Sequence, residues 1–279
     1  MTNRPARFSQ VRRVLFACAL VTVPAAFAQD MPEAPPKDSA KAFVRSVVLD
    51  QKRIWTSPFH MTRQDAKWWL IFGAVTGALI ATDHRSSQQL PNTPDQLAVG
   101  RGVSRLGAVY TLVPLAGAFY LGGVLTRQSK LRETGLLGAE ALVDGLIVSE
   151  VLKAATGRQR PLEGDGGGHF FHGSDAFPSG HSTESFALAS VIAHRYQDNK
   201  AVVVLAYGLA TMVGAARFSA RQHSASDIVA GGAIGWFIGR HVAEGRLRGS
   251  RSPAKLLPHV VPQVQPAEHS YGLSLAWHP

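Results

Sequence analysis

Six apolar segments, rich in glycine, alanine and leucine, most strongly constrain the fold of this chain. They run over residues 66–82, 108–125, 135–153, 182–195, 201–215 and 228–243. Small residues at this frequency are typical of helices that pack closely against one another. None of the segments alternates between apolar and polar residues as a β-strand does. We therefore predict an all-α fold, a six-helix up-down bundle with short connections.

The composition lies between that of a dense helical globule and that of a membrane protein. Each segment has 14 to 19 residues, at or below the roughly 20 that cross a bilayer. The third segment contains Glu140, Asp144 and Glu150, which would be unfavourable facing lipid. Charged residues make up 17% of the chain, which is low for a soluble domain, yet the mean hydropathy is only +0.02.

Residues 1–28 have the features of a cleaved secretory signal peptide, with an uncleaved anchor helix as the alternative. Four arginines precede an apolar run, and Ala26-Phe27-Ala28 forms a small-x-small cleavage site. Cys18 is the only cysteine, so a mature chain would have no disulfide and no cysteine-based metal site. Removal of the four arginines lowers the net charge from +10 to +6. Export makes lipid headgroups and phosphorylated small molecules better partners than nucleic acid for this basic chain.

The rest of the chain is expected to form three parts. Residues 29–64 are a lead-in, in which the amphipathic stretch 41–56 predicts a short helix on the bundle or on a membrane surface. Residues 65–245 form the helical domain. Residues 246–279 are a basic and then proline-rich tail, in which 271–277 could form a small strand.

Three short stretches, far apart in the sequence, hold the residue types that bind and cleave a phosphate ester. They are Lys153 to Pro161, Pro178-Ser179-Gly180-His181, and Arg217 to Asp227. Neighbouring helices in an up-down bundle are antiparallel, so the end of the third and fifth helices and the start of the fourth and sixth share one face. We therefore predict that the three stretches meet in an active site at one end of the bundle.

Three basic residues and the start of one helix have the chemistry of a phosphate-binding site. Lys153, Arg160 and Arg217 supply donors that suit the oxygens of a tetrahedral anion. Ser179 and Gly180 open a helix whose free N–H groups and positive dipole end favour an anion. Together they predict a phosphate-binding cradle.

A histidine and a carboxylate complete the third stretch. His223 and Asp227 are four residues apart, so they can meet across one helical turn. A carboxylate that accepts from one ring nitrogen would fix the tautomer and leave the other nitrogen as a nucleophile. Asp83 follows the first predicted helix at the same end, where it could rim the site, although we expect it to cap that helix. The loop residues His169 and His172 are better explained as loop histidines than as metal ligands.

The ordered motifs resemble the signature of the type 2 phosphatidic acid phosphatase and vanadium haloperoxidase superfamily, which includes the bacterial class A acid phosphatases. The family pattern is Lys-x6-Arg-Pro, Pro-Ser-Gly-His and Ser-Arg-x5-His-x3-Asp, and the resemblance covers about residues 135–243. It implies a helical bundle of the type 2 phosphatidic acid phosphatase kind. One position departs from the pattern, because Ala216 stands where relatives have a serine that supports the phosphate site. Its absence would lower the rate or shift the specificity.

The resemblance also implies roles for the site residues. His223 would attack phosphorus and form a phosphohistidine, Asp227 would hold the imidazole, and His181 would protonate the leaving oxygen and then activate water. The equatorial oxygens would be bound by Lys153, Arg160, Arg217, Ser179 and Gly180. No metal or other cofactor is required by this mechanism.

The function implied is a phosphatase acting on a lipid phosphate such as phosphatidic acid or an isoprenyl pyrophosphate. One alternative is an exported acid phosphatase of broad specificity acting on small-molecule phosphate esters. A second is a haloperoxidase holding vanadate in the same cradle, although the chain is short for that class. A third is an envelope scaffold without activity, against which the complete set of cations and histidines argues.

The basic residues and the signal peptide disagree about topology. Basic residues at 127–132, 195 and 200 lie opposite the motifs, so the positive-inside rule places the site outside the cytoplasm. A cleaved signal followed by six crossing helices would place it inside. Either the bundle is periplasmic and lies on or beside the membrane, or fewer segments cross. The short segments favour an exported, membrane-associated bundle in the bacterial cell envelope.

Overall fold

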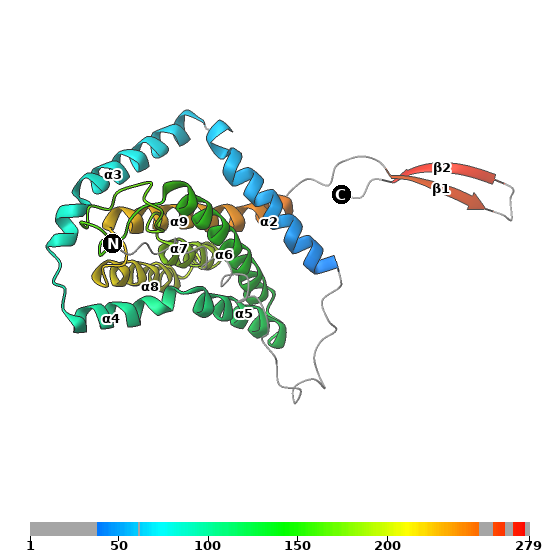
Figure 1. Cartoon of the computed structure of the whole chain (residues 1–279). Helices are drawn as coiled ribbons and strands as arrows, with labels where there is room; N and C mark the ends of the chain where they lie inside the picture. Colours follow the sequence, from blue (N-terminus) through cyan, green and yellow to red (C-terminus); the bar gives the residue numbers. More distant parts are fainter. Residues whose placement is uncertain (1–37, 61, 251–258, 266–269, 277–279) are drawn as a thin grey trace, which may run out of the picture. The chain divides into compact units, whose positions relative to one another are not determined.

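The computed structural model describes residues 38–60, 62–250, 259–265 and 270–276 (Figure 1). Two compact units are present, one ending at Val242 and the other beginning at Ala243. The predicted signal peptide lies outside the described residues. The elements in chain order are α2 (Asp38–Thr56), η2 (Ser57–His60), α3 (Arg63–Gln88), α4 (Pro94–Ser104), η3 (Arg105–Gly107), α5 (Val109–Leu125), α6 (Ser129–Thr156), α7 (Gly180–Arg195), α8 (Lys200–Ser219), α9 (Ala225–Ser250), β1 (His259–Gln265) and β2 (Ser270–Ala276).

All six predicted segments are helical, in α3 and α5 to α9. The all-α prediction is therefore confirmed for the described residues up to Ser250. The predicted count of six helices is not confirmed, because α4 forms where no helix was expected. Local signals explain α4. The hydroxyl of Thr93 accepts a hydrogen bond from the backbone N–H of Gln96 at 3.3 Å, and Pro94 occupies the first helical turn. The helix is fixed to α8, since the Gln96 amide donates to the Ser219 carbonyl at 2.9 Å.

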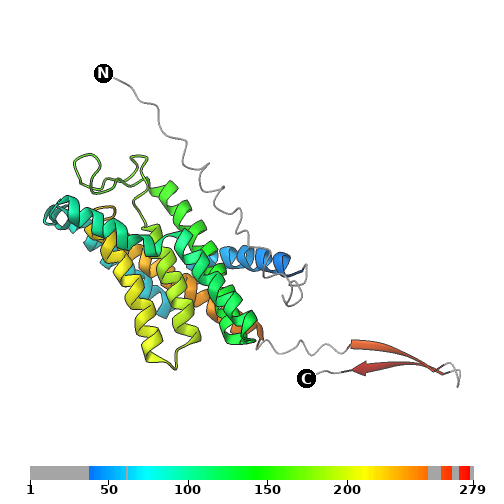
Figure 2. The same cartoon turned by 90° about the horizontal axis from the view of Figure 1, so that it is seen from below.

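Helix α7 is central to the packing and carries the Ser179-Gly180-His181 stretch at its start. Its residues Ala187 and Val191 pack with α6 and α9 in a core of buried side chains, and Leu188 packs with α5 and α6 in a second core. Figure 2 shows α5 to α8, from green to yellow, running alongside one another. The approach of α9 is so close that a Cβ at Gly235 or Gly239 would collide with a backbone carbonyl of α7.

Helix α2 corresponds to the predicted amphipathic helix at 41–56. Its residues Val47 and Ile54 are buried, and Ile54 belongs to the core shared by α6, α7 and α9. The amide of Gln51 donates to a carboxylate oxygen of Asp144 on α6 at 2.9 Å. The amphipathic stretch therefore lies on the bundle in this structure.

The distribution of polar and apolar residues on helix α3 is the reverse of that on a surface helix of a water-soluble protein. It buries the polar residues Thr76, Asp83 and Ser87 and exposes Trp68 and Leu70. Trp69 contacts Phe237 of α9 edge-on, with ring centroids 6.1 Å apart. The buried face of α3 thus brings a carboxylate, Asp83, to the inside of the bundle.

The tail contains a two-stranded antiparallel ribbon. Val261 of β1 pairs with Ser274 of β2. The strand predicted at 271–277 is confirmed as β2, and β1 was not expected from the sequence.

Candidate active site

Four helix ends bring the three predicted stretches together at one end of the bundle. Lys153 lies in the last turn of α6, Ser179 precedes α7, Arg217 lies in the last turn of α8, and Asp227 lies in the first turn of α9. The backbone N–H of Ser179 donates to the backbone carbonyl of Asp227 at 2.9 Å. The antiparallel order predicted this meeting of helix ends.

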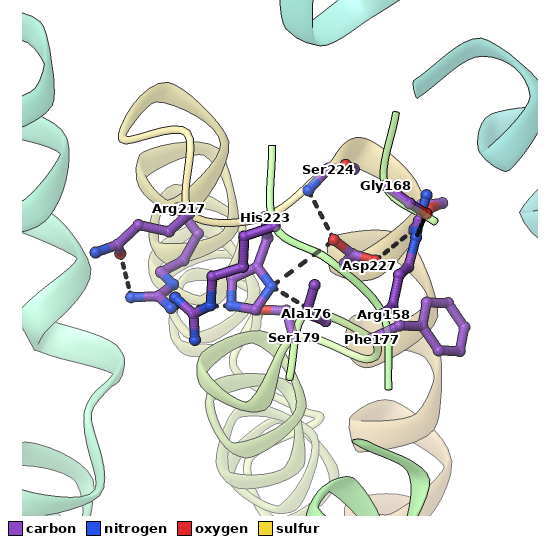
Figure 3. A network of polar contacts seen from close by, with 12 residues as sticks. Arg158, Gly168, Ala176, Phe177, Ser179, Arg217, His223, Ser224 and Asp227 are labelled. Atoms are coloured by element: carbon purple, nitrogen blue, oxygen red, sulfur yellow. Dashed lines mark hydrogen bonds and ion pairs between the residues drawn. The ribbon is translucent and has the colours of Figure 1, made fainter. Parts of the chain in front are cut away.

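His223 lies at the centre of the group, buried between a cation and a backbone carbonyl (Figure 3). Its Nδ1 lies 2.8 Å from the carbonyl oxygen of Ala176, and its Nε2 lies 2.9 Å from Nη2 of Arg217. A carbonyl only accepts and a guanidinium only donates. Nδ1 therefore carries the proton, and Nε2 presents its lone pair to Arg217.

The carboxylate of Asp227 does not hold the imidazole in the way the sequence spacing predicted. Its Oδ2 is 3.8 Å from Nδ1 of His223, beyond hydrogen-bond distance. The carboxylate is instead occupied by the backbone N–H of Ser224 at 2.8 Å and by Nη1 of Arg158 at 2.5 Å. The tautomer is set by Ala176, while Asp227 supplies a nearby negative charge.

Burial shapes the ionisation of this pair. Burial first, and then the positive charges of Arg217 and Arg160, lower the pKa of His223 well below its ordinary value, so the imidazole is neutral. Burial raises the pKa of Asp227 to about 6, against the opposing charge and hydrogen bonds of Arg158. A neutral imidazole with a lone pair on Nε2 has the form that a nucleophile requires.

The three predicted phosphate-binding cations each have a partner in the structure. Lys153 Nζ is 2.6 Å from a carboxylate oxygen of Glu150, and Arg160 Nε is 2.8 Å from Oδ1 of Asp175. Arg217 contacts Gln222 and His223. Burial raises the pKa of Asp175, but the hydrogen bond and charge of Arg160, together with the charge of Lys153 and smaller effects, outweigh burial and the net shift is downward. These contacts hold the cations around His223 in positions from which phosphate oxygens could replace the present partners.

The helix start contributes small residues and a second histidine. Ser179 is fully buried, and its hydroxyl does not cap α7 but accepts a hydrogen bond from the Ser182 hydroxyl at 3.2 Å. Burial, together with the charges of Arg217 and other neighbours, lowers the pKa of His181 to about 3. Both histidines of the site are therefore neutral at neutral pH.

Sequence reasoning missed one important residue of the site, Arg158. It lies in the basic loop between two predicted cations, yet it is fully buried and contacts two carboxylates, Asp227 and Asp83. Asp83 was expected to cap the first helix, but it lies inside α3 and accepts from the backbone N–H of Ser226 at 3.1 Å. The sequence signal for Asp83 was its place just after the first predicted helix, at the end of the bundle where the motifs meet.

His169 and His172 lie close to each other in the loop that connects α6 and α7. Nε2 of His169 is 3.1 Å from Oδ2 of Asp165, and the two histidine rings lie 5.8 Å apart. Within the described part of the chain, no group of three or more His, Cys, Asp or Glu side chains is arranged to hold a metal ion.

The family comparison agrees with the motif pattern. Residues 134–248 match the family model of the PAP2 superfamily, an interval that contains all eight predicted site residues. A transmembrane PAP2-type phosphatidylglycerolphosphate phosphatase from Bacillus subtilis is similar at 20% identity and a TM-score of 0.48, covering 78% of this chain and 99% of its own. LpxE from Aquifex aeolicus is similar at 20% identity and a TM-score of 0.40, covering 55% and 88%. No curated protein sequence matches the chain.

Proposed function

We propose that the protein is a metal-independent phosphatase of the PAP2 superfamily, whose family model matches residues 134–248, and that it hydrolyses a lipid phosphate through a phosphohistidine. The observation that carries the proposal is the state of His223. Its imidazole is buried and neutral, its Nδ1 is fixed by the Ala176 carbonyl, and its Nε2 faces Arg217 at 2.9 Å. A phosphoryl group held by Arg217 would lie next to the nitrogen that attacks it.

The cradle would bind the phosphoryl group through its non-bridging oxygens. Lys153, Arg160 and Arg217 supply positive charge, and the N–H groups of the first turn of α7, which have no acceptor within the helix, add donors near Gly180. On binding, the phosphate oxygens would replace the present partners of these cations. Neutralisation of the negative charge on the phosphoryl oxygens is the main electrostatic contribution expected to the rate of phosphoryl transfer.

In the first step, the lone pair on Nε2 of His223 forms a bond to phosphorus as the bond from phosphorus to the lipid oxygen breaks. His181, in the first turn of α7, takes up a proton when the bound phosphate dianion raises its pKa, and it gives this proton to the leaving oxygen. The phosphorylated imidazole carries an additional positive charge. The carboxylate of Asp227, 3.8 Å from Nδ1, stabilises that charge.

In the second step, His181 accepts a proton from water as the water oxygen attacks phosphorus. The bond between nitrogen and phosphorus breaks, inorganic phosphate leaves, and His223 returns to its neutral form. Each histidine ends the cycle in the state in which it began.

Exposed apolar side chains support a substrate that comes from a membrane. Large apolar residues cover the outer faces of α3, α5 and α8: Trp68, Leu70, Tyr110, Leu125, Val204, Leu205 and Leu209. Two segments, Pro94–Leu125 and Lys200–Ser219, are long and apolar enough to cross a membrane by length and composition, and 22% and 28% of their apolar windows are buried. We therefore propose membrane association in the cell envelope, with a lipid phosphate favoured over a soluble ester.

The test is hydrolysis by purified full-length protein in detergent. Phosphatidate, phosphatidylglycerophosphate, undecaprenyl pyrophosphate and a chromogenic phosphate would be compared, with halide oxidation in added vanadate measured in parallel. We expect phosphate release from at least one lipid and an acid-labile phosphoenzyme. His223→Ala should abolish both, whereas His172→Ala in the exposed loop should retain them. Full activity in His223→Ala would contradict the proposal, and halide oxidation without phosphate release would favour the haloperoxidase.

A further inference from the structure

Asp83 and Arg158 form a buried ion pair next to Asp227, and in Figure 3 Arg158 lies on the side of Asp227 opposite His223 and Arg217. Neither residue was among the predicted site residues, and they are 75 positions apart in the sequence. Arg158 is 0% exposed and Asp83 is 2% exposed. An arginine in such a place cannot reach a substrate phosphate, so its role must be sought in the groups it contacts.

Every nitrogen of the Arg158 guanidinium is engaged by the protein. Nη1 contacts Oδ1 of Asp227 at 2.5 Å and the hydroxyl of Ser226 at 2.5 Å, and Nη2 contacts Oδ2 of Asp83 at 2.8 Å. Nε donates to the carbonyl of Gly168 at 2.9 Å, and the guanidinium lies 4.8 Å from the ring centroid of Phe170. Figure 3 shows Arg158 beside Phe177 with its guanidinium directed toward Asp227. The side chain is held from several directions in one orientation.

Asp83, on α3, contacts the same group of residues around Asp227. Its Oδ1 accepts the backbone N–H of Ser226 at 3.1 Å, and its Oδ2 accepts the Ser226 hydroxyl as well as Arg158. Ser226 is the residue immediately before Asp227. Asp83 therefore holds both the backbone that precedes Asp227 and the cation that pairs with its carboxylate.

We infer that Asp83 and Arg158 are a positioning pair that holds the Asp227 carboxylate ionised and oriented toward His223, so that α3 completes the active site. The inference rests on the proposed phosphatase function. One guanidinium pairs with two carboxylates. The strength with which Arg158 stabilises ionised Asp227 therefore depends on its interaction with Asp83. If the contacts among Asp83, Arg158 and Asp227 served only to stabilise the fold, their removal would leave the pKa of Asp227 without effect on the pH dependence of activity.

Sharing of the guanidinium predicts that two substitutions act in opposite directions. In Asp83→Asn, Arg158 has no second anion, so it stabilises ionised Asp227 more strongly and lowers its pKa. In Arg158→Lys, a single ammonium cannot bridge both carboxylates, so the pKa of Asp227 rises. The mechanism needs ionised Asp227, and activity is therefore lost as pH falls through the pKa of this group, about 6 in the native network.

The experiment is a pH profile of kcat/KM for both variants in the full-length protein. We expect the acid limb to move down in Asp83→Asn and up in Arg158→Lys, by about one pH unit each, with kcat at the plateau reduced about tenfold in each. Ionisation of the substrate is the same for every variant, so the displacement between variants belongs to the protein. Glu133→Gln is the matched control, because it breaks an ion pair of 2.6 Å with Arg195 at the other end of α7. It should leave the limb in place.

Other outcomes would contradict the positioning role, the proposed function or both. Unmoved limbs in both variants would show that the pair does not set Asp227, even if activity is reduced. Loss of the cooperative unfolding transition in both variants would mark the network as structural and would also contradict the inference. Wild-type protein that hydrolyses no phosphate ester would contradict the proposed function and the positioning role with it. An active wild type with unmoved limbs would contradict the positioning role alone.

Discussion

The ammonium group of Lys153 lies against the backbone of Gly180, and a Cβ built on Gly180 would be 2.9 Å from Lys153 Nζ. The contact joins the end of α6 to the start of α7. It places the lysine charge beside the free N–H groups of a helix N-terminus, so both favour an anion at the same point. A side chain at position 180 would have to displace the lysine.

Gly180→Ala should therefore weaken phosphate binding and transition-state stabilisation. A methyl group at this position would move Lys153 Nζ by a fraction of an ångström or more, and displacements near 1 Å can lower rates about a hundredfold. We expect kcat/KM to fall about 10- to 100-fold, measured by steady-state kinetics on the best substrate of the panel.

Gly208→Ala serves as the control for this substitution. Gly208 is an exposed residue within α8, and nothing lies within 4 Å of a Cβ built on it. Alanine is favoured over glycine in a helix interior by about 1 kcal/mol. This variant should retain activity and be slightly more stable, whereas a comparable loss of activity would show that the Lys153 contact is not the cause.

Glu184 predicts a pH-dependent change in stability. It is buried one turn into α7, near Gly180. Burial raises its pKa from an ordinary value of 4.5 to about 8, against the charge of Lys153. The folded protein thus keeps a proton that the unfolded chain has released, so this group lowers stability progressively as pH rises from about 4.5 to about 8.

Glu184→Gln removes that loss. The Tm of the variant relative to wild type should rise as pH increases from 4 to 8, as measured by thermal unfolding, and change little above about 8. Comparison at pH 4, where the wild-type side chain is protonated in both states, separates ionisation from packing. A difference in Tm that does not vary with pH would show that Glu184 ionises normally.

The low pKa of His181 predicts that substrate binding prepares the general acid. Burial and the surrounding cations lower its pKa to about 3 in the unliganded protein. A bound phosphate dianion would neutralise those cations, so the pKa of His181 should rise when inorganic phosphate or vanadate binds. NMR titration of the histidine rings with and without the ligand would show this.

Loss of His181 should depend on the leaving group. His181→Asn removes the proton donor, so hydrolysis of an alkyl phosphate should slow by about 100- to 10,000-fold. Nitrophenolate leaves without protonation, so the chromogenic phosphate should still give an initial burst of nitrophenol. Equal losses of the first step for both substrates would contradict the role of His181 as the acid.

How much of this site could be predicted from the sequence depended on where each residue lies. Lys153, Arg217 and Asp227 lie at helix ends, and helix ends follow from apolar periodicity and antiparallel order. The predicted contact between His223 and Asp227 was less accurate. A spacing of four residues allows two side chains to meet on a helix, but it does not determine that they form a hydrogen bond. The partner of His223 is the Ala176 carbonyl, and a backbone carbonyl has no sequence signature.

The network of Asp83 and Arg158 could not be predicted for a different reason. Burial of a charged residue depends on tertiary partners, here a carboxylate 75 residues away on a helix whose apolar residues face outward. From the sequence, Arg158 is one cation among several in a basic loop. The same limit applies to α4, whose cap at Thr93 is readable but whose packing against α8 is not.

Ala216 offers a test of the one departure from the family pattern. The residue is largely buried in the last turns of α8, directly before Arg217. Ala216→Ser would add a hydroxyl beside the predicted cradle, and one hydrogen bond to a phosphate oxygen contributes about 0.5–1.5 kcal/mol, or two- to tenfold in rate. We expect kcat/KM to rise by this factor in the steady-state assay. Ala216→Val, which adds bulk without a donor, should not raise it; an equal gain in both variants would assign the effect to packing.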